Sequence, residues 1–336
     1  MRIARSLSIG LVAGLVAGLA GVAVAKPVTS TKDKAGGKDS AKPKADDKLA
    51  ELLKLTADPV LGKADRISGE ERKGMVAFTF DDGPNPETTP AVIDALVKYD
   101  VPATFFIVSQ RLLGKHGEKS RQVLARQLES GFGVESHSFS HPNLRGANSA
   151  KLTKEVDEAV KILAKEANRS IGMFRAPFGA IDNTGRGWLK KRGLTEVFWS
   201  VDTLDWKAHD REKLRKKIFR MIVKQHGGVV LMHDVKPITA DVVADVLDDL
   251  EEENCRRLAD KEEPIWPVSI HYFLRDAKKP RAIPDEVTKR TDAYRAALPG
   301  RCAKRPPPPS SLVDILQLLL APAAPPAPAT TLPAKP

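Results

Sequence analysis

Two adjacent carboxylates, those of Asp81 and Asp82, follow an apolar run and precede a Gly-Pro pair. The apolar run, residues 75–78, is typical of a buried strand, and Gly83-Pro84 predicts a turn that redirects the backbone. Adjacent carboxylates repel each other, so the pair is costly unless a cation takes up one of the charges. We therefore expect an ion-binding loop at the end of a strand, with the second acid free to act as a base.

Two histidines, His137 and His141, follow a second apolar run at residues 131–134. Because they lie four residues apart, their imidazoles can converge on one ion if the segment coils into a turn. One Asp and two His make a three-ligand metal site with open positions, which is a catalytic arrangement. Each half is weak evidence alone, since Asp-Asp-Gly-Pro is also a common loop composition. The two halves together predict a metal site.

Between residues 74 and 275, apolar runs alternate with amphipathic stretches. The expected strands cover residues 75–80, 103–108, 133–136, 172–175, 196–200, 229–233 and 268–271. The expected helices cover residues 87–99, 120–130, 149–167, 184–191, 210–224 and 240–252. Repeated strand-helix units predict an α/β domain with a parallel sheet, which is either an open doubly wound sheet or a barrel.

The positions of the reactive side chains favour the barrel. These side chains fall at or just after the ends of different expected strands: Asp81, Asp82, His137, Arg175, Asp202, Asp205 and His233. A barrel gathers its active groups in this way, because loops from many strands meet at one mouth. An open sheet brings fewer of them together at its switch point. The prediction is a distorted (β/α)7 barrel with disordered N- and C-terminal extensions.

Three further segments carry residues with useful chemistry. They are Phe174-Arg175-Ala176-Pro177-Phe178-Gly179, Val201-Asp202-Thr203-Leu204-Asp205-Trp206 and Leu231-Met232-His233-Asp234. Taken singly, they fit a salt bridge, an Asp-rich turn over a core Trp and a hydrogen-bonded core His. Their joint order, after the Asp-Asp and His-His segments, resembles the five motifs of the polysaccharide deacetylase family, also called the NodB-homology family or carbohydrate esterase family 4. The resemblance covers about residues 74–275.

The resemblance implies a distorted barrel, a divalent metal that is usually zinc, and hydrolysis of acetyl groups from N-acetylglucosamine polymers or acetylated xylan. It implies that the metal is held by Asp82, His137 and His141. It also implies that Asp81 is the general base and that Arg175 orients it. Cobalt or another divalent ion would suit the same ligands.

The remaining roles implied by the resemblance concern proton donation and substrate binding. His233 is implied to be the general acid, and Asp205 to tune its proton affinity. Trp206 and Leu231 resemble the walls of a pocket for the acetyl methyl group, and the backbone amide near Phe178 resembles an oxyanion donor. The Arg motif departs modestly from the family, because Arg-Ala-Pro-Phe stands where Arg-Pro-Pro-Tyr is frequent. Phe178 therefore lacks the hydroxyl with which a Tyr could bind a sugar.

The residue chemistry agrees with an amide hydrolase. Such a reaction needs an electrophile, a base for the water proton and an acid for the departing amine. A metal, Asp81 and His233 would supply these three functions. An iron-dependent oxygenase also uses two His and one carboxylate, but it has little use for the second Asp and a separate acid. A non-catalytic wall-binding protein would need neither base nor acid.

We expect the substrate to be an N-acetylglucosamine-containing polysaccharide, such as peptidoglycan, a chitin-like polymer or an exopolysaccharide. An acid that protonates a poor amine leaving group suits N-acetyl groups more than O-acetyl groups. The alternatives are O-deacetylation of acetylxylan and carbohydrate binding without catalysis. Nucleic acid is not an expected partner, since no recognition motif accompanies the positive charge.

The N-terminal segment predicts export to the periplasm or the outside of the cell. Residues 1–25 contain a basic start, an apolar stretch and a small-residue cleavage site at Ala23-Val24-Ala25, as a signal peptide does. Cleavage removes Arg2 and Arg5 but no acid, so the formal charge falls from +11 to +9. The next segment, residues 26–73, is expected to be a Lys-rich linker. Its basic part would be attracted to anionic envelope polymers, or would act only as a solvated tether.

The remaining expectations concern the C-terminal extension, residues 276–336. Cys255 and Cys302 are compatible with one disulfide in an oxidising compartment, which would tie this extension to the domain at residues 74–275. The tail after Arg305 is rich in Pro and Ala, and only residues 312–320 could form a short apolar helix in it. We expect the protein to be a monomer.

Overall fold

The structure is a computed structural model that describes residues 45–56, 66–115, 117–274 and 285–305. All of them belong to the second of the two units into which the chain divides, Pro43–Pro336. The expected signal peptide and the expected helix at residues 312–320 lie outside the described residues. Among the helices that the structure describes, none is both long enough and apolar enough to cross a membrane.

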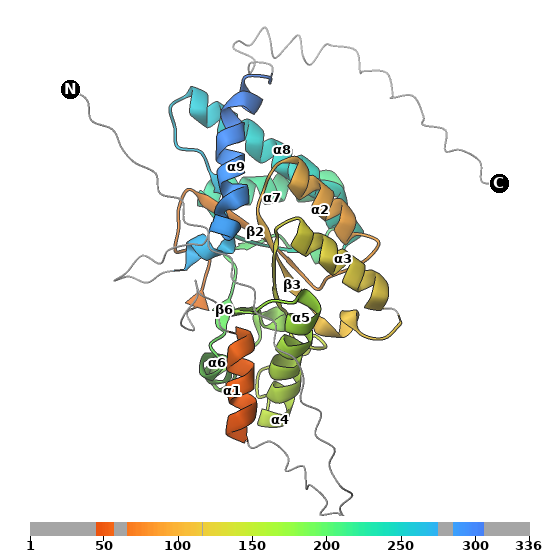
Figure 1. The fold of residues 1–336 in the computed structure, drawn as a ribbon. Helices are drawn as coiled ribbons and strands as arrows, with labels where there is room; N and C mark the ends of the chain where they lie inside the picture. The colour runs from red at the N-terminus through yellow and green to blue at the C-terminus, as the bar shows by residue number, and fades with distance from the viewer. Residues whose placement is uncertain (1–44, 57–65, 116, 275–284, 306–336) are drawn as a thin grey trace, which may run out of the picture. The chain divides into compact units, whose positions relative to one another are not determined.

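Nine strands of the described chain join in one sheet, and every pairing between them is parallel (Figure 1). The strands are β1 (Arg66–Ile67), β2 (Met75–Asp81), β3 (Ala103–Ile107), β4 (Gly133–Ser136), β5 (Met173–Phe174), β6 (Thr195–Val197), β7 (Val201–Asp202), β8 (Gly227–His233) and β9 (Trp266–Pro267). Their order is β1-β6-β5-β4-β3-β2-β8-β7, and β9 pairs with the start of β2.

The sheet curls into a distorted barrel because one segment of chain reaches both of its ends. Strand β6 pairs with the end strand β1, whereas β7, at the other end, pairs with β8, and only residues 198–200 separate β6 from β7. Within that gap, the Ser200 amide donates a hydrogen bond to the Val229 carbonyl of β8 at 3.1 Å. The predicted barrel of parallel strands is therefore confirmed.

Helices cover the outside of the strands (Figure 1). They are α1 (Ala45–Thr56), α2 (Thr89–Lys98), α3 (Gly117–Glu129), α4 (Ser149–Leu152), α5 (Ala159–Ala167), α6 (Asn183–Lys191), α7 (Arg211–Gln225), α8 (Pro237–Ala259) and α9 (Asp285–Cys302). A π-helical segment, Thr153–Glu158, joins α4 to α5. Three helices begin at side-chain caps, where Asn148, Asp182 and Asp210 each accept a bond from the amide three residues later.

Successive side chains of a strand point alternately outward, into the apolar layer beneath the helices, and inward, into the barrel. In β2, the side chains of Val76, Phe78 and Phe80 pack in the larger core beneath the helices, while Ala77 belongs to a second cluster inside the barrel. This second cluster contains Ile67, Ala77, Phe106, Met173, Val197 and Val229. Because successive side chains point to opposite faces, the next inward positions of β2 are Thr79 and Asp81. The interior is thus apolar at the start of the strands and polar at their ends.

The segment after β9 differs from its prediction. Residues 268–271 were expected to form a strand, but the structure has the two-residue β9 and then a 3-10 helix, Ile270–Phe273. Val268, Ile270 and Phe273 are buried in the interior cluster, so this segment fills the end of the barrel where β2 starts. Burial against the interior outweighs the strand propensity of the sequence.

Both predicted extensions contain helices, so the expectation of disorder is wrong for these parts. Helix α1 occupies residues 45–56 of the expected linker, and its Leu52 is buried in the outer core. The Ile171 amide donates to the Leu55 carbonyl at 2.8 Å, which fixes α1 next to the start of β5. The sequence analysis gave weight to the lysines of this segment and missed its apolar residues, which recur at helical spacing.

Helix α9 lies in the expected C-terminal extension and packs against α8. The predicted disulfide between Cys255 and Cys302 is present, with the two Cα atoms 5.3 Å apart. Arg301 adds an ion pair to the buried Glu251 of α8 at 2.8 Å. The extension is therefore attached to the barrel by a covalent bond and by a buried charge pair.

We predict that the double variant Cys255→Ser/Cys302→Ser is less stable than the parent. The disulfide spans 47 residues, and closing a loop of that length corresponds to about 4 kcal/mol of unfolded-state entropy. Denaturant unfolding should show a loss of this order or somewhat less. Equal unfolding midpoints for the oxidised parent and the variant would show that the bond adds no stability.

Candidate active site

The two adjacent aspartates point to different places because the backbone turns between them. Asp81 is the last residue of β2 and is directed into the barrel, where its side chain is buried. Asp82 has a φ of 76°, a left-handed conformation that is uncommon outside glycine. Gly83 follows, and a Cβ atom there would lie 2.3 Å from the buried Asp234 carboxylate. The turn therefore requires a residue without a side chain at position 83.

Asp82 lies close to His137 and His141, the two histidines that were predicted to share a metal site with it. The Asp82 Oδ1 atom is 3.1 Å from His141 Nε2 and 3.5 Å from His137 Nε2. One possible ligand atom from each of these three residues lies within 4.8 Å of the others. Asp82 Oδ1 is buried, and among the described residues it has no hydrogen bond of acceptable geometry. Three donor atoms that converge in this way suit a divalent cation of the zinc type.

The protonation of the ligands also suits a metal. His137 Nδ1 is 2.8 Å from the Arg175 carbonyl, so it must carry a proton that it donates, and Nε2 keeps its lone pair. Burial is the main influence on His137 and lowers its pKa, which favours the neutral ring. Burial alone would raise the pKa of Asp82, but the neighbouring His141 and His137 hold it well below its usual value. The structure thus favours a neutral imidazole beside an ionised carboxylate.

The loop between the histidines is bent by two residues with positive φ, Ser138 at 71° and His141 at 63°. The Ser138 hydroxyl oxygen accepts a hydrogen bond from the His141 amide at 2.9 Å. This local bond closes the turn and brings the second imidazole back toward the first, with 5.0 Å between the ring centroids. The predicted convergence of the two rings is present.

Asp81 forms a buried ion pair with Arg175, as the resemblance implied. Arg175 Nη1 donates to Asp81 Oδ1 at 2.7 Å and to the Thr79 hydroxyl at 2.8 Å. The other Asp81 oxygen, Oδ2, is 3.6 Å from His137 Nε2. One oxygen of Asp81 is therefore fixed by the guanidinium, and the other faces the cluster of Asp82 and the histidines.

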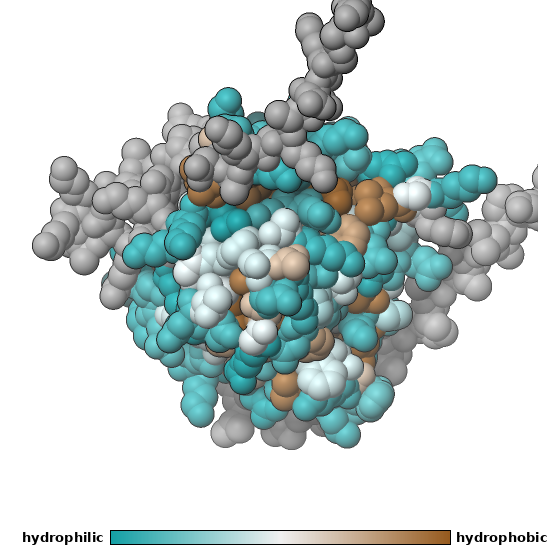
Figure 2. All heavy atoms as spheres, turned by 90° about the horizontal axis from the view of Figure 1, so that it is seen from below, coloured by the Kyte–Doolittle hydropathy of each residue, from teal (hydrophilic) through white to brown (hydrophobic). Residues whose placement is uncertain are grey.

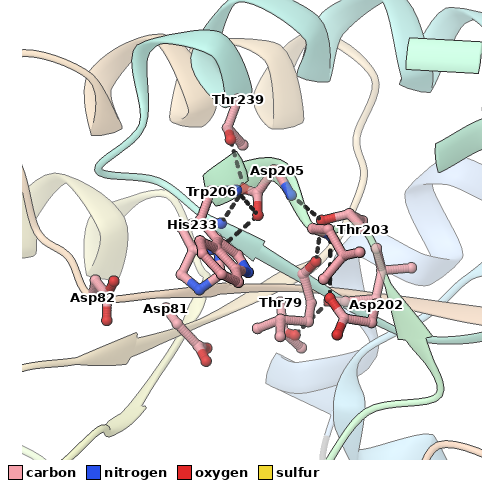
Figure 3. A network of polar contacts seen from close by, with 12 residues as sticks. Thr79, Asp81, Asp82, Asp202, Thr203, Asp205, Trp206, His233 and Thr239 are labelled. Atoms are coloured by element: carbon pink, nitrogen blue, oxygen red, sulfur yellow. Dashed lines mark hydrogen bonds and ion pairs between the residues drawn. The ribbon is translucent and has the colours of Figure 1, made fainter. Parts of the chain in front are cut away.

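His233 and Asp205 form a second pair beside Asp81, because β8 is next to β2 and His233 is in register with Asp81. His233 Nδ1 and the His233 amide lie 2.7 Å from Asp205 Oδ1 and Oδ2, respectively. The Thr239 hydroxyl donates to Asp205 Oδ2 at 2.6 Å, so the carboxylate is held from both sides. Figure 3 shows the His233 ring directed from Asp205 toward the side where Asp81 lies.

The surroundings of His233 favour its protonated form. Burial lowers the pKa of an imidazole, but here the hydrogen bond and charge of Asp205 outweigh it and raise the pKa of His233 to about 9. Burial would likewise raise the pKa of Asp205, and the bonds from His233 and Thr239 leave it below its usual value. The pair is thus an imidazolium bound to a carboxylate at neutral pH.

The residues expected to bind substrate surround these groups. Trp206 is 51% exposed and follows Asp205 directly, whereas Leu231 is buried two positions before His233 on β8. Phe178 is 69% exposed, has a φ of 58°, and meets the His141 ring edge-on at 4.6 Å. As the second residue of a 3-10 helix, Phe178 has an amide without an intrahelical acceptor. The role of this amide as an oxyanion donor stays a prediction.

Several residues around the site were missed by the sequence analysis. A cavity of ≈ 410 Å³ beside the two histidines is lined by Asp82, Val108, Gln110, Arg111, Ser140 and His141. The hydroxyls of Thr79, Ser138 and Thr239 bind Arg175, the His141 amide and Asp205. Ser138 could have been suspected from its place between the histidines. The two threonines carry no local signal, because only the barrel brings them to their partners.

Comparison with known proteins assigns the chain to a family. Residues 68–197 match the model of the polysaccharide deacetylase family. The chain is 36% identical over 179 residues to a chitooligosaccharide deacetylase from Azorhizobium caulinodans, a match that covers 53% of this chain and 81% of that protein. The chain therefore belongs to the polysaccharide deacetylase family.

Other relatives agree with this assignment. A peptidoglycan-N-acetylglucosamine deacetylase from Bacillus cereus is 34% identical over 167 residues, which is 50% of this chain. A solved peptidoglycan N-acetylglucosamine deacetylase has 28% identity and a TM-score of 0.52, over 65% of this chain and 96% of that one. A family 4 carbohydrate esterase pseudoenzyme from Bacillus anthracis, at 21% identity and a TM-score of 0.50, shares the fold over 59% of this chain and 66% of that one.

The matches do not extend over the whole of every relative. The chain spans 58% of the Bacillus cereus protein and 36% of a peptidoglycan-N-acetylglucosamine deacetylase from Listeria monocytogenes. The family match covers residues 68–197, which include Asp81, Asp82, His137, His141 and Arg175. Asp205 and His233 follow the matched range.

The His233–Asp205 pair makes a prediction for the metal-free protein. His233 should titrate near pH 9, and in Asp205→Asn its pKa should fall, because the hydrogen bond and charge of Asp205 oppose burial more strongly than Asp81 and Asp82 do. The parent should therefore keep its imidazole proton to a higher pH than the variant. NMR titration of the imidazole measures both values. Asp202→Asn, which alters an acid that does not contact His233, is the matched control, and an equal shift there would contradict the assigned cause.

Proposed function

We propose that this protein is a metal-dependent hydrolase that removes N-acetyl groups from an N-acetylglucosamine-containing polysaccharide. The observation that carries the proposal is a three-residue metal cluster flanked by two separate proton-transfer groups. The cluster is Asp82, His137 and His141, and the flanking groups are Asp81 and His233. Binding alone would require neither a positioned base nor a positioned acid.

The metal ligands in this proposal are Asp82 Oδ1 and the Nε2 atoms of His137 and His141. Three protein ligands leave coordination positions for water and substrate, as in catalytic zinc sites. When bound there, such an ion polarises the acetyl carbonyl and lowers the pKa of its water. Zinc suits two imidazoles and one carboxylate, and cobalt is the first alternative to test.

Asp81 is suited to be the general base. Arg175 holds Asp81 Oδ1, which leaves Oδ2 directed toward the metal cluster. In this position, Oδ2 can take the proton of an attacking water. Arg175 is fully buried and also donates to the Phe198 carbonyl at 3.2 Å, so it fixes the orientation of the base within the barrel.

His233 is suited to be the general acid. Its Nδ1 proton is engaged by Asp205, so Nε2 is the position from which a proton can pass to the departing amine. The raised pKa ensures that this proton is present at neutral pH. Trp206 directly follows Asp205, and Leu231 lies two positions before His233 on β8, which supports their assignment as walls of a pocket for the acetyl methyl group.

The choice of an N-acetyl substrate rests on the acid and on the relatives. An amine is a poor leaving group without a proton, whereas an alkoxide leaves with less help. The Bacillus cereus and Azorhizobium relatives are a peptidoglycan-N-acetylglucosamine deacetylase and a chitooligosaccharide deacetylase. Acetylxylan O-deacetylation remains the second candidate. Export by the N-terminal segment would place the enzyme where acetylated envelope polymers occur.

An iron-dependent oxygenase would share the two His and one carboxylate. The buried Asp81–Arg175 pair and the His233–Asp205 pair have no role in that chemistry. Activity that requires zinc but neither oxygen nor a reductant would distinguish hydrolysis from oxygenation.

The test is a substrate panel with the purified full-length protein, zinc, and four substrates: chitin oligomers, peptidoglycan, an N-acetylated exopolysaccharide and acetylated xylan. We expect acetate and free amines to appear in equal amounts from at least one amino-sugar polymer. Asp81→Asn should stay folded and bind zinc yet lose turnover by about 10²–10⁴-fold, because it loses a proton-transfer group.

Three outcomes would separate the alternatives. Acetate from acetylated xylan alone would replace N-deacetylation with ester hydrolysis and leave the site assignment intact. Binding of a polymer without acetate release would favour a carbohydrate-binding protein. Near-parent turnover in Asp81→Asn would show that the base lies elsewhere.

A further inference from the structure

The loop that carries both histidines is held from outside by one buried glutamate, Glu155. Glu155 Oε2 accepts a hydrogen bond from the Ser140 amide at 2.8 Å, and Oε1 accepts one from the Ser140 hydroxyl at 2.8 Å. The Glu155 backbone carbonyl also accepts the Phe139 amide at 3.1 Å. A single residue therefore binds two consecutive residues of the loop through three acceptor atoms.

Because Glu155 is buried, its carboxylate depends on these contacts for hydrogen bonds. The residue is 3% exposed, so its carboxylate cannot rely on water for hydrogen bonds. Both oxygens are instead satisfied by Ser140. A buried charge of this kind is costly unless it is hydrogen-bonded, and here the partners come from the residue just before His141. The loop must therefore place Ser140 where it can donate hydrogen bonds to the Glu155 carboxylate.

The local helix geometry explains how Glu155 reaches the loop. It lies in the π-helical segment Thr153–Glu158, between α4 and α5. A π turn includes one more residue than an α turn, so it changes the direction of the side chains relative to a regular helix. It also changes the pairing of the carbonyls, and the Glu155 carbonyl accepts a bond from outside the helix. Segments of this type are frequent at functional sites.

The loop needs this support because its own conformation is unfavourable. Ser138 and His141 both have positive φ, which residues with a Cβ rarely adopt. The residues that follow β3 also support the loop, since the Ser109 and Gln110 amides donate to the Ser138 and Phe139 carbonyls at 3.1 and 3.0 Å. The carboxylate of Glu155 supplies the contacts on the Ser140 side, next to the second metal ligand.

We propose that Glu155 is a positioning residue for the metal site, which acts through Ser140 to hold His141 Nε2 at the distance that metal binding requires. The inference rests on the proposed metal function. Glu155 does not touch the metal ligands through its side chain, so its effect is on affinity for the metal and not on proton transfer. Outer partners of metal ligands commonly affect metal affinity by about 10–100-fold.

The test measures zinc affinity by competition with a chelator, at a temperature where all variants are folded. Glu155→Ala should bind zinc about 10–100-fold more weakly than the parent. Ser140→Ala should lose less, because the Ser140 amide can still donate to the carboxylate. Glu155→Gln should stay close to the parent, since an amide side chain can accept from the amide and donate to the hydroxyl.

A matched control separates positioning from a loss of stability. Glu251→Ala removes another buried glutamate, one that pairs with Arg301 and Arg305 at the contact of α8 and α9. It should lower the unfolding temperature but leave zinc affinity unchanged. In a His141→Ala background, Glu155→Ala should have little further effect on zinc affinity, because the two residues act on the same ligand.

The turnover of Glu155→Ala at saturating zinc adds a second readout. If Glu155 acts by positioning a ligand, excess zinc should restore most of the turnover. Parent-like zinc affinity in folded Glu155→Ala, or equal loss in Glu251→Ala, would overturn the inference. A parent that binds no zinc would instead contradict the proposed function, so the two failures are distinguishable.

Discussion

The buried guanidinium of Arg175 connects the barrel strands to the candidate active site. Arg175 is fully buried and donates to Thr79 and Asp81 of β2, to the Val197 carbonyl of β6 and to the Phe198 carbonyl next to it. Its guanidinium also lies over the Phe106 ring at 4.1 Å. Such a charge is tolerated inside a protein only when it is paired and its donors are satisfied. These contacts hold the strands in their relative positions and hold the Asp81 side chain beside the guanidinium.

The separation of two adjacent acids follows from this pairing. Because Arg175 engages Asp81 within the barrel, the left-handed turn at Asp82 can direct the second carboxylate to the histidines. The backbone carbonyl of Arg175 sets the tautomer of His137, so the same residue contributes to both halves of the site. The mouth thus holds charges of both signs in fixed places: an ionised acid beside the two histidines, an acid paired with Arg175, and an imidazolium paired with Asp205. Preorganised charge of this kind is the main source of catalytic power in many enzymes.

Much of this arrangement could be predicted from the sequence, because its signals are local. The strand ends, the turn after Asp82 and the four-residue spacing of His137 and His141 are each read from a short segment, and the family resemblance relates them to one another. What could not be predicted depends on tertiary contacts. The helix at residues 45–56 is stabilised by packing against the barrel, and residues 270–273 leave the strand conformation because they fill the barrel interior. Glu155 was missed because neither its burial nor the π turn that directs it has a sequence signal.

The face seen in Figure 2 is largely hydrophilic with scattered apolar residues, which is an ordinary surface and does not identify a polymer-binding track.

In this mechanism Asp82 binds the metal and Asp81 does not, and the zinc dissociation constants of Asp81→Asn and Asp82→Asn distinguish these two roles. Both substitutions remove one charge from neighbouring residues and preserve side-chain shape, so a purely electrostatic effect on the site would be similar in the two. We expect Asp82→Asn to lose zinc affinity strongly, because it removes a ligand oxygen, and Asp81→Asn to bind zinc almost as the parent does. Equal losses in the two variants, or a greater loss in Asp81→Asn, would contradict the account.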